Sequence, residues 1–114
     1  MIGFKTGVML HDLCSQMVMA HVSIVEVYQR RAFDCIITSG SDGKHSLTSL
    51  HYDGKALDYR TRHMTETQAI EVHAEVRKIL PRDFDVILHE RVVVDGVVKD
   101  PGHLHVEYQP RRPT

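Results

Sequence analysis

Residues 103–108 read His-Leu-His-Val-Glu-Tyr, a strict alternation of polar and apolar side chains. Because successive side chains on a β-strand point to opposite faces, this pattern predicts a strand with one apolar face and one polar face. The apolar face holds Leu104, Val106 and Tyr108, and the polar face holds His103, His105 and Glu107. An apolar face has to be buried, so we expect this strand to belong to a sheet that packs on other elements.

Other segments of the chain predict the remaining strands, from alternation or from a high content of β-branched apolar residues. They are residues 34–38, 56–61, 84–88 and two valine-rich arms at 92–94 and 97–98. Asp95-Gly96 between the arms is a favoured sequence for the type I′ turn of a β-hairpin. In residues 56–61, Leu57 and Tyr59 share one face, and Asp58 and Arg60 share the other.

Two segments predict helices. Apolar residues recur at steps of three and four over residues 10–31, the stripe of an amphipathic helix. A second helix is expected after Thr65, with Gln68 in capping-box register, and Pro81 ends it. The sequence therefore predicts an α+β fold with an antiparallel sheet and two main helices, in a single domain over residues 1–114.

Length and charge exclude some function classes. The 114 residues include 14 Lys and Arg against 15 Asp and Glu, for a formal net charge of -1. This balance argues against nucleic acid or an acidic membrane as a partner. The chain has no apolar run of membrane-spanning length and no signal-peptide cleavage pattern near its start. We expect a monomer without a membrane span that is synthesised in the cytoplasm without a signal peptide.

The candidate chemistry lies in two histidine-containing segments. Residues 49–58 contain His51 and Asp58, and the strand at 103–108 contains His103 and His105. A catalytic zinc site keeps three protein ligands, drawn from imidazole nitrogens and carboxylate oxygens, and a water in the fourth position. The two segments can supply such a set. Spacing alone leaves a second interpretation open, in which the histidines are surface residues and Asp58 pairs with a neighbouring arginine.

These segments resemble the family of zinc peptidases that includes the D-Ala-D-Ala carboxypeptidases, the murein endopeptidases and the hedgehog signalling domain. The family signature Ser-x-His-x-x-Gly-x-Ala-x-Asp is filled here by Ser49, His51, Gly54, Ala56 and Asp58. The residues at 38–46 and 58–61 resemble small phage-type members. His103-Leu104-His105 is similar to the closing His-x-His strand. The resemblance covers about half of the chain.

The resemblance implies a hedgehog/D-Ala-D-Ala-peptidase-like fold that binds one Zn²⁺ ion through His51, Asp58 and His105. It makes His103 the general base that takes a proton from the attacking water. The implied function is zinc-dependent hydrolysis of an amide bond in peptidoglycan stem peptides or cross-links, on the cell wall after release or as part of a virion. The alternative is a non-catalytic zinc-binding interaction module of the hedgehog type.

Two assignments remain open within the resemblance. Asp100-Pro101-Gly102-His103 also fits an Asp-x-x-His pattern, with Asp100 as the base and His103 as a ligand, and a third arrangement has both histidines of the strand on the metal. Peptidoglycan stems carry free carboxylates, so cations near the site are expected to bind substrate. The candidate substrate-binding residues are Lys44, Lys55 and Arg60, with Ser49 of the motif.

Overall fold

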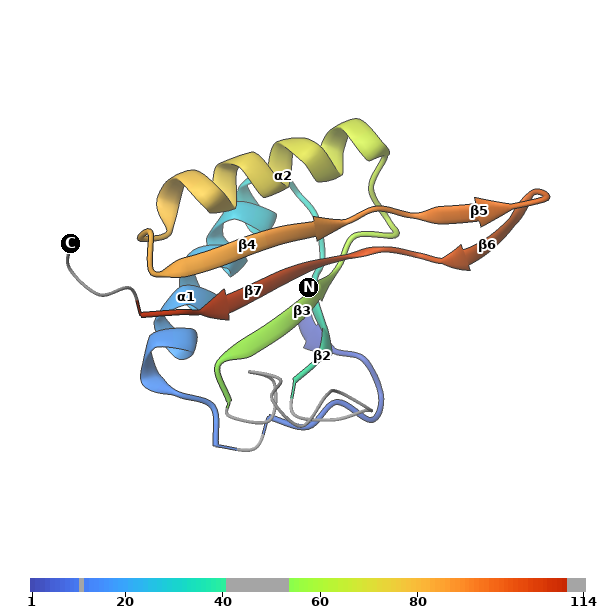
Figure 1. Ribbon diagram of the computed structural model, residues 1–114. Helices are drawn as coiled ribbons and strands as arrows, with labels where there is room; N and C mark the ends of the chain where they lie inside the picture. Colours follow the sequence, from blue (N-terminus) through green and yellow to red (C-terminus); the bar gives the residue numbers. More distant parts are fainter. Residues whose placement is uncertain (11, 41–53, 111–114) are drawn as a thin grey trace.

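The computed structural model describes residues 1–10, 12–40 and 54–110. Two helices and seven strands follow one another along this part of the chain (Figure 1). In order they are β1 (Ile2–Phe4), α1 (Ser15–Arg30), β2 (Cys35–Ser39), β3 (Ala56–Arg60), α2 (Glu66–Ile79), β4 (Phe84–His89), β5 (Val92–Val94), β6 (Val97–Asp100) and β7 (His103–Tyr108). The expected α+β class with two helices is confirmed.

The main sheet has five strands in the order β1-β2-β3-β7-β4, and β5 pairs with β6 in a separate two-stranded sheet. All neighbours in the main sheet are antiparallel except β1 and β2, which are parallel. The expectation of an antiparallel sheet is therefore wrong in this respect, and the sheet is mixed. Parallel strands need a long crossover connection, and α1 supplies it between β1 and β2.

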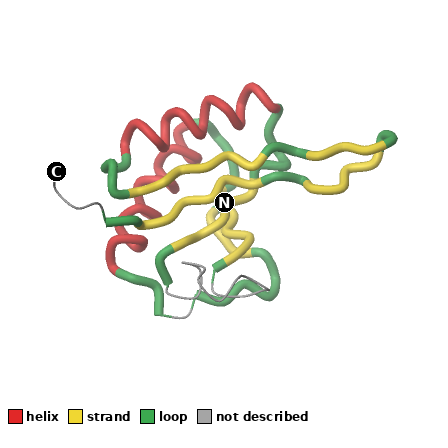
Figure 2. The backbone as a smooth tube through the Cα atoms, viewed as in Figure 1, coloured by secondary structure: helices red, strands yellow, loops and turns green. Residues whose placement is uncertain are grey.

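Both helices lie on one side of the main sheet, and the core fills the space between them (Figures 1 and 2). The predicted alternation of β7 is confirmed by burial, because Leu104 and Val106 are fully buried while the intervening side chains are only partly so. In β3, Leu57 and Tyr59 are fully buried, but Asp58 between them is buried as well. The side chains buried in the core include Met17, Ile24, Val27, Tyr28, Leu57, Tyr59, Val72, Val76, Leu104 and Val106. No helix among the described residues lies on the other side of the sheet.

The first helix begins at Ser15, five residues later than the apolar stripe predicts. Asp12 has a φ of 52°, which a right-handed helix cannot include. The backbone N–H of Cys14 donates to the carbonyl of Gly54 at 2.9 Å, which ties this segment to the start of β3. Leu10 and Leu13 still pack against the core, so the stripe marks buried positions correctly although its first part is a loop.

Gly54 has a positive φ of 68° and lies where a larger residue does not fit. A Cβ atom there would lie 2.0 Å from the carbonyl oxygen of Asp12. This close approach explains in steric terms why the motif has glycine at this position.

The second helix has the predicted beginning. The Thr65 hydroxyl accepts from the backbone N–H of Gln68 at 3.1 Å, and the Gln68 side chain accepts from the backbone N–H of Thr65 at 2.9 Å. These two bonds form the capping box. The helix ends at Ile79, shortly before Pro81. Neither α1 nor α2 has the length and apolar character that a membrane crossing requires.

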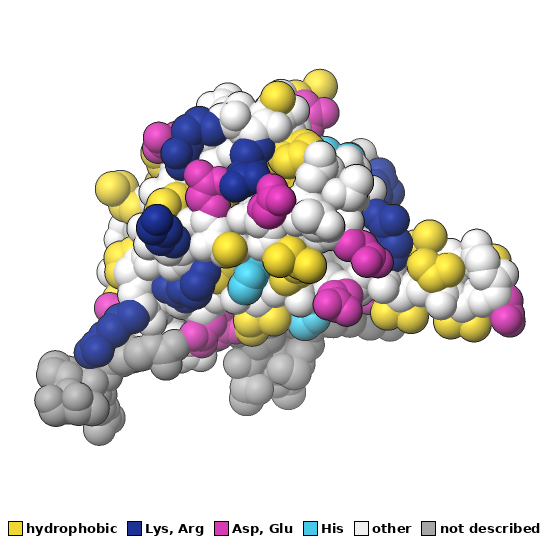
Figure 3. Space-filling model, turned by 90° about the horizontal axis from the view of Figure 1, so that it is seen from above, with side chains coloured by type: hydrophobic (Ala, Val, Ile, Leu, Met, Phe, Trp, Pro, Cys, Tyr) yellow, Lys and Arg dark blue, Asp and Glu magenta, His cyan; other side chains and the backbone are white. Residues whose placement is uncertain are grey.

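The hairpin of β5 and β6 continues β4 and β7 away from the body of the molecule (Figure 1). Asp95 and Gly96 both have positive φ, at 51° and 77°, which confirms the type I′ turn. The five valines of the hairpin are each about half exposed. In the view from above, this projecting end carries hydrophobic side chains, whereas positive and negative side chains are interspersed over the body (Figure 3).

Candidate metal centre

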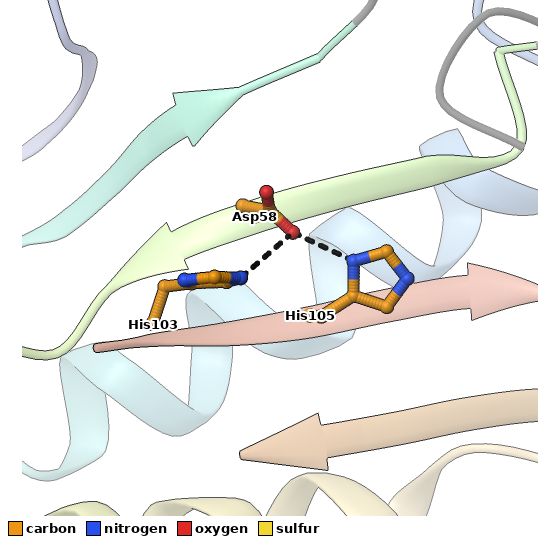
Figure 4. A group of neighbouring side chains, drawn as sticks. All are labelled: Asp58, His103 and His105. Atoms are coloured by element: carbon orange, nitrogen blue, oxygen red, sulfur yellow. Dashed lines mark hydrogen bonds and ion pairs between the residues drawn. The ribbon is translucent and has the colours of Figure 1, made fainter. Parts of the chain in front are cut away.

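The candidate site lies where β3 and β7 pair in the middle of the sheet. Asp58 is directly opposite His105 in the register of the two strands, and Arg60 is opposite His103. Directly opposite residues share a face, so these side chains lie together on the face of the sheet away from α1 and α2 (Figure 4). The pairing of two alternating strands thus brings an acidic residue next to two histidines.

The three side chains are close enough to share one ion. The Oδ1 atom of Asp58 lies 2.7 Å from Nδ1 of His105 and 3.7 Å from Nε2 of His103. One ligand atom from each residue lies within 4.8 Å of the other two. Asp58 and His105 are almost buried, with side-chain exposures of 11% and 15%, whereas His103 is 31% exposed.

The chemistry of these donors fits a divalent metal ion. Ligand bonds of about 2.1 Å in a tetrahedral site place neighbouring donor atoms about 3.4 Å apart. The separations of 2.7 Å and 3.7 Å from Asp58 lie on either side of this value, and the two imidazole nitrogens lie within 4.8 Å of each other. One carboxylate with two imidazoles is a donor set that suits transition metals. Asp58, His103 and His105 therefore form a group that can hold an ion.

The surroundings shift the pKa values of His103 and His105 in opposite directions. Burial lowers the pKa of His105, but the hydrogen bonds and charges of Asp58 and Glu107 outweigh it, and the pKa lies above the usual value. Burial also lowers the pKa of His103, and the nearby His89 and His105 add to this effect against the opposing charge of Asp58. His103 is the more easily neutral imidazole of the pair.

Two residues that sequence reasoning gave no role are also part of this face. The ring of His89 stacks on that of His103, with centroids 4.5 Å apart, because the two residues are opposite each other on β4 and β7. Glu107 accepts from Nε2 of His105, with 2.9 Å between the two atoms. The sequence spacing could have placed Glu107 at the site, because a residue two positions after His105 on a strand lies on the same face. His89 lies next to His103 only because of the register in which β4 pairs with β7.

Arg60, a candidate for substrate binding, lies beside the site. It lines a hollow of ≈ 180 Å³ together with Lys5, Arg62 and His103. Asp100, the alternative base, lines the same hollow, and its Oδ1 atom accepts the backbone N–H of Gly102 at 2.8 Å. Lys55 lies just before β3, and its backbone carbonyl accepts from the N–H of Tyr108 at 2.8 Å. The predicted ligand His51 and the predicted substrate-binding residues Lys44 and Ser49 lie outside the described residues.

Among the described residues, three further histidines have structural partners, and Nε2 of one of them, His63, is 2.9 Å from the carbonyl oxygen of Asp34. Nδ1 of His21 is 2.8 Å from the hydroxyl of Tyr59, on the core side of the sheet. Nε2 of His73 is 2.8 Å from the carbonyl oxygen of Val86 and joins α2 to β4. These contacts account for His21 and His73 without a metal.

Comparisons with protein-family models, with curated proteins and with solved structures find no match. The fold and the candidate site show only the general class of the protein. It is a small α+β protein with a mixed sheet, and the face of this sheet away from the two helices carries a group of one carboxylate and two histidines that can hold a metal ion.

Proposed function

We propose that the chain is a zinc-dependent peptidase that hydrolyses an amide bond in the stem peptides or cross-links of peptidoglycan. The observation that carries the proposal is the meeting of Asp58 with His103 and His105 on one face of the sheet, although the segments are far apart in sequence. These are the positions at which the sequence resembles the hedgehog/D-Ala-D-Ala-peptidase-like enzymes. The resemblance and the geometry thus support the same site.

Zinc is the proposed ion because two or more imidazoles with one carboxylate are typical zinc ligands. The proposed ligands are Asp58 and His105 with His51 of the motif. When bound, zinc lowers the pKa of a coordinated water to about 7 and polarises a carbonyl group. Asp58 and His105 would hold the ion from the rigid centre of the sheet, so its position relative to the substrate would be fixed.

His103 is the proposed general base. It is more exposed than His105 and lies farther from Asp58, so its ring can face a substrate. A neutral imidazole at this position can take a proton from the attacking water and return it to the leaving amine. The other candidate base, Asp100, binds the backbone N–H of Gly102 in the turn before β7, which favours His103.

The charges that line the hollow beside His103 support the proposal that the substrate is anionic. Lys5, Arg60 and Arg62 line it, and one carboxylate, that of Asp100, lies among them. Arginine binds carboxylates through paired hydrogen bonds, and peptidoglycan stems carry free carboxylates. We propose that a stem carboxylate binds here, next to the general base.

The direct test is to incubate the zinc-loaded protein with purified murein and to measure new amino and carboxyl termini. We expect new termini from at least one murein among samples that differ in stem chemistry. The Asp58→Ala variant should release none, and His63→Gln, which removes an exposed histidine outside the site, should match the parent. No cleavage of any murein by the zinc-loaded parent contradicts the proposal.

Zinc stoichiometry of two variants tests the proposed roles of the histidines. We expect His105→Ala to lose stoichiometric zinc and His103→Ala to retain it while losing hydrolysis. If His103→Ala loses zinc and His105→Ala keeps it, the Asp-x-x-His arrangement with Asp100 as base is correct. Loss of zinc from both variants means that both histidines are ligands.

A non-catalytic zinc-binding interaction module is the second candidate, and the projecting hairpin favours it. Val93 and Val98 face each other on this hairpin, and all five of its valines are about half exposed. Exposed apolar surface of this kind is typical of interaction sites. Zinc binding without cleavage of any murein supports this candidate.

A further inference from the structure

Glu107 lies at the far side of His105 from Asp58. Asp58 contacts Nδ1 of the imidazole at 2.7 Å, and Glu107 contacts Nε2 at 2.9 Å, so the ring lies between two carboxylates. The other oxygen of Glu107, Oε2, accepts from the side-chain amide of Gln109 at 3.1 Å. Glu107 is itself mostly buried, with a side-chain exposure of 17%. Contacts at both oxygens hold its carboxylate in place.

We propose that Glu107 is a positioning residue of the metal centre, which binds the Nε2–H of His105 and so presents Nδ1 to the ion. This inference rests on the metal centre of the proposed function but is independent of the hydrolysis. It assigns a role to a residue beyond the expected ligands and base.

The physical argument starts from the symmetry of the imidazole ring. A neutral histidine has one protonated nitrogen and one free nitrogen, and only the free one can bind a metal ion. The partner of the second nitrogen decides which one is protonated and how the ring is turned. For His105, Nδ1 faces Asp58 and His103, while Nε2 faces Glu107. Both nitrogens contact a carboxylate, but Asp58 is itself a proposed ligand, so an ion between Asp58 and Nδ1 takes the place of a proton there, while Glu107 keeps the proton on Nε2.

The contact between Glu107 and His105 follows from the geometry of the strand. Residues two apart on a strand share a face, so Glu107 is next to His105 without any special backbone geometry. Glu107 is opposite Ala56 on β3, whose side chain is small, and opposite Asp85 on β4. Gln109 is again two residues further on. The positioning group is thus built from alternate residues of one segment.

Zinc affinity of purified variants is the first test. We expect zinc binding about 10- to 100-fold weaker for Glu107→Ala. Glu107→Gln keeps an acceptor oxygen without the charge, so its loss should be smaller. Glu26→Gln is the matched control, because it removes one charge from an exposed part of α1 and should bind zinc like the parent. Circular dichroism and urea unfolding establish that each variant is folded.

The protonation pattern of His105 is the second test, and a merely structural role for Glu107 would not change it. In the zinc-loaded parent with ¹⁵N-labelled histidine, we expect NMR to show the proton on Nε2 and the metal on Nδ1. In Glu107→Ala, the Nε2 proton should exchange with water faster. A proton on Nδ1 in the parent overturns the inference, as does unchanged zinc affinity in folded Glu107→Ala.

Failure of the inference and failure of the proposed function give different results. A parent that binds zinc and cleaves murein, with Glu107→Ala binding zinc equally well, overturns only the role of Glu107. A parent that binds zinc but cleaves nothing, with weaker zinc binding by Glu107→Ala, overturns only the peptidase. A parent that does not bind zinc overturns both.

Discussion

Removal of the metal should lower the thermal stability of the protein by an amount that depends on Asp58. An ion that binds the folded chain through residues brought together by folding stabilises that state by mass action. Asp58 and His105 are adjacent only when β3 and β7 are paired. We therefore expect zinc to raise the unfolding temperature of the parent and to have little effect on Asp58→Ala.

The size of the shift follows from the length of the chain. Free zinc at about 100 times its dissociation constant contributes about 2.7 kcal/mol. Unfolding entropy is about 2.1 cal/mol/K per residue, which amounts to about 0.24 kcal/mol/K for 114 residues. The expected rise in unfolding temperature is therefore about 11 °C. The unfolded chain has nine histidines and two cysteines, and zinc binding to them would reduce this rise in unfolding temperature.

Thermal unfolding followed by circular dichroism, with zinc and then with excess EDTA, measures the shift. His63→Gln is the control, since it removes one histidine from the unfolded chain and leaves the candidate centre intact. It should show the same rise as the parent. An equal rise in Asp58→Ala and in the parent would refute the reasoning, because zinc would then be bound elsewhere.

Three further predictions concern the apoprotein. Leu104→Ala, at a fully buried site, should lose about 2–5 kcal/mol in urea unfolding, whereas exposed Val98→Ala should change by less than about 0.5 kcal/mol. Thr65→Ala removes the capping box and should cost about 1 kcal/mol in the same assay. Burial lowers the pKa of His21, so its contribution to stability is present above the usual value of 6.5 and is lost as pH falls through the lowered pKa. A His21→Gln variant should therefore show a smaller loss of unfolding free energy on acidification, and an equal loss would contradict this.

The parts of the fold that depend on neighbouring residues were predictable from the sequence. The alternation of residues 103–108 reflects the two-residue period of a strand, and Thr65 with Gln68 forms a local capping motif. The strand β1 was not predicted because three residues carry too little pattern. Its parallel pairing with β2 depends on the path of the chain through α1.

The sequence predicted Asp58, His103 and His105 of the candidate site, but not every residue that lies beside them. The sequence showed that His103, His105 and Asp58 lie on polar faces, and strand pairing decides which of them meet. The stacking of His89 on His103 depends on the register of β4 with β7. No pattern within residues 84–89 indicates this register, so His89, the third histidine of the site face among the described residues, was missed.

The strand β7 follows β3 and β4 in sequence but lies between them in the sheet, which affects how the protein can be made. Before residues 103–108 leave the ribosome, β3 and β4 have no strand between them, and their facing edges stay unpaired. His103 and His105 of the candidate centre are synthesised at the same stage as this strand. A translation product that stops after Asp100 would keep Asp58 but lack both histidines and the strand that joins β3 to β4, and its unpaired apolar strands would make it prone to aggregation. Completion of the sheet and completion of the metal centre thus depend on the same segment of the chain.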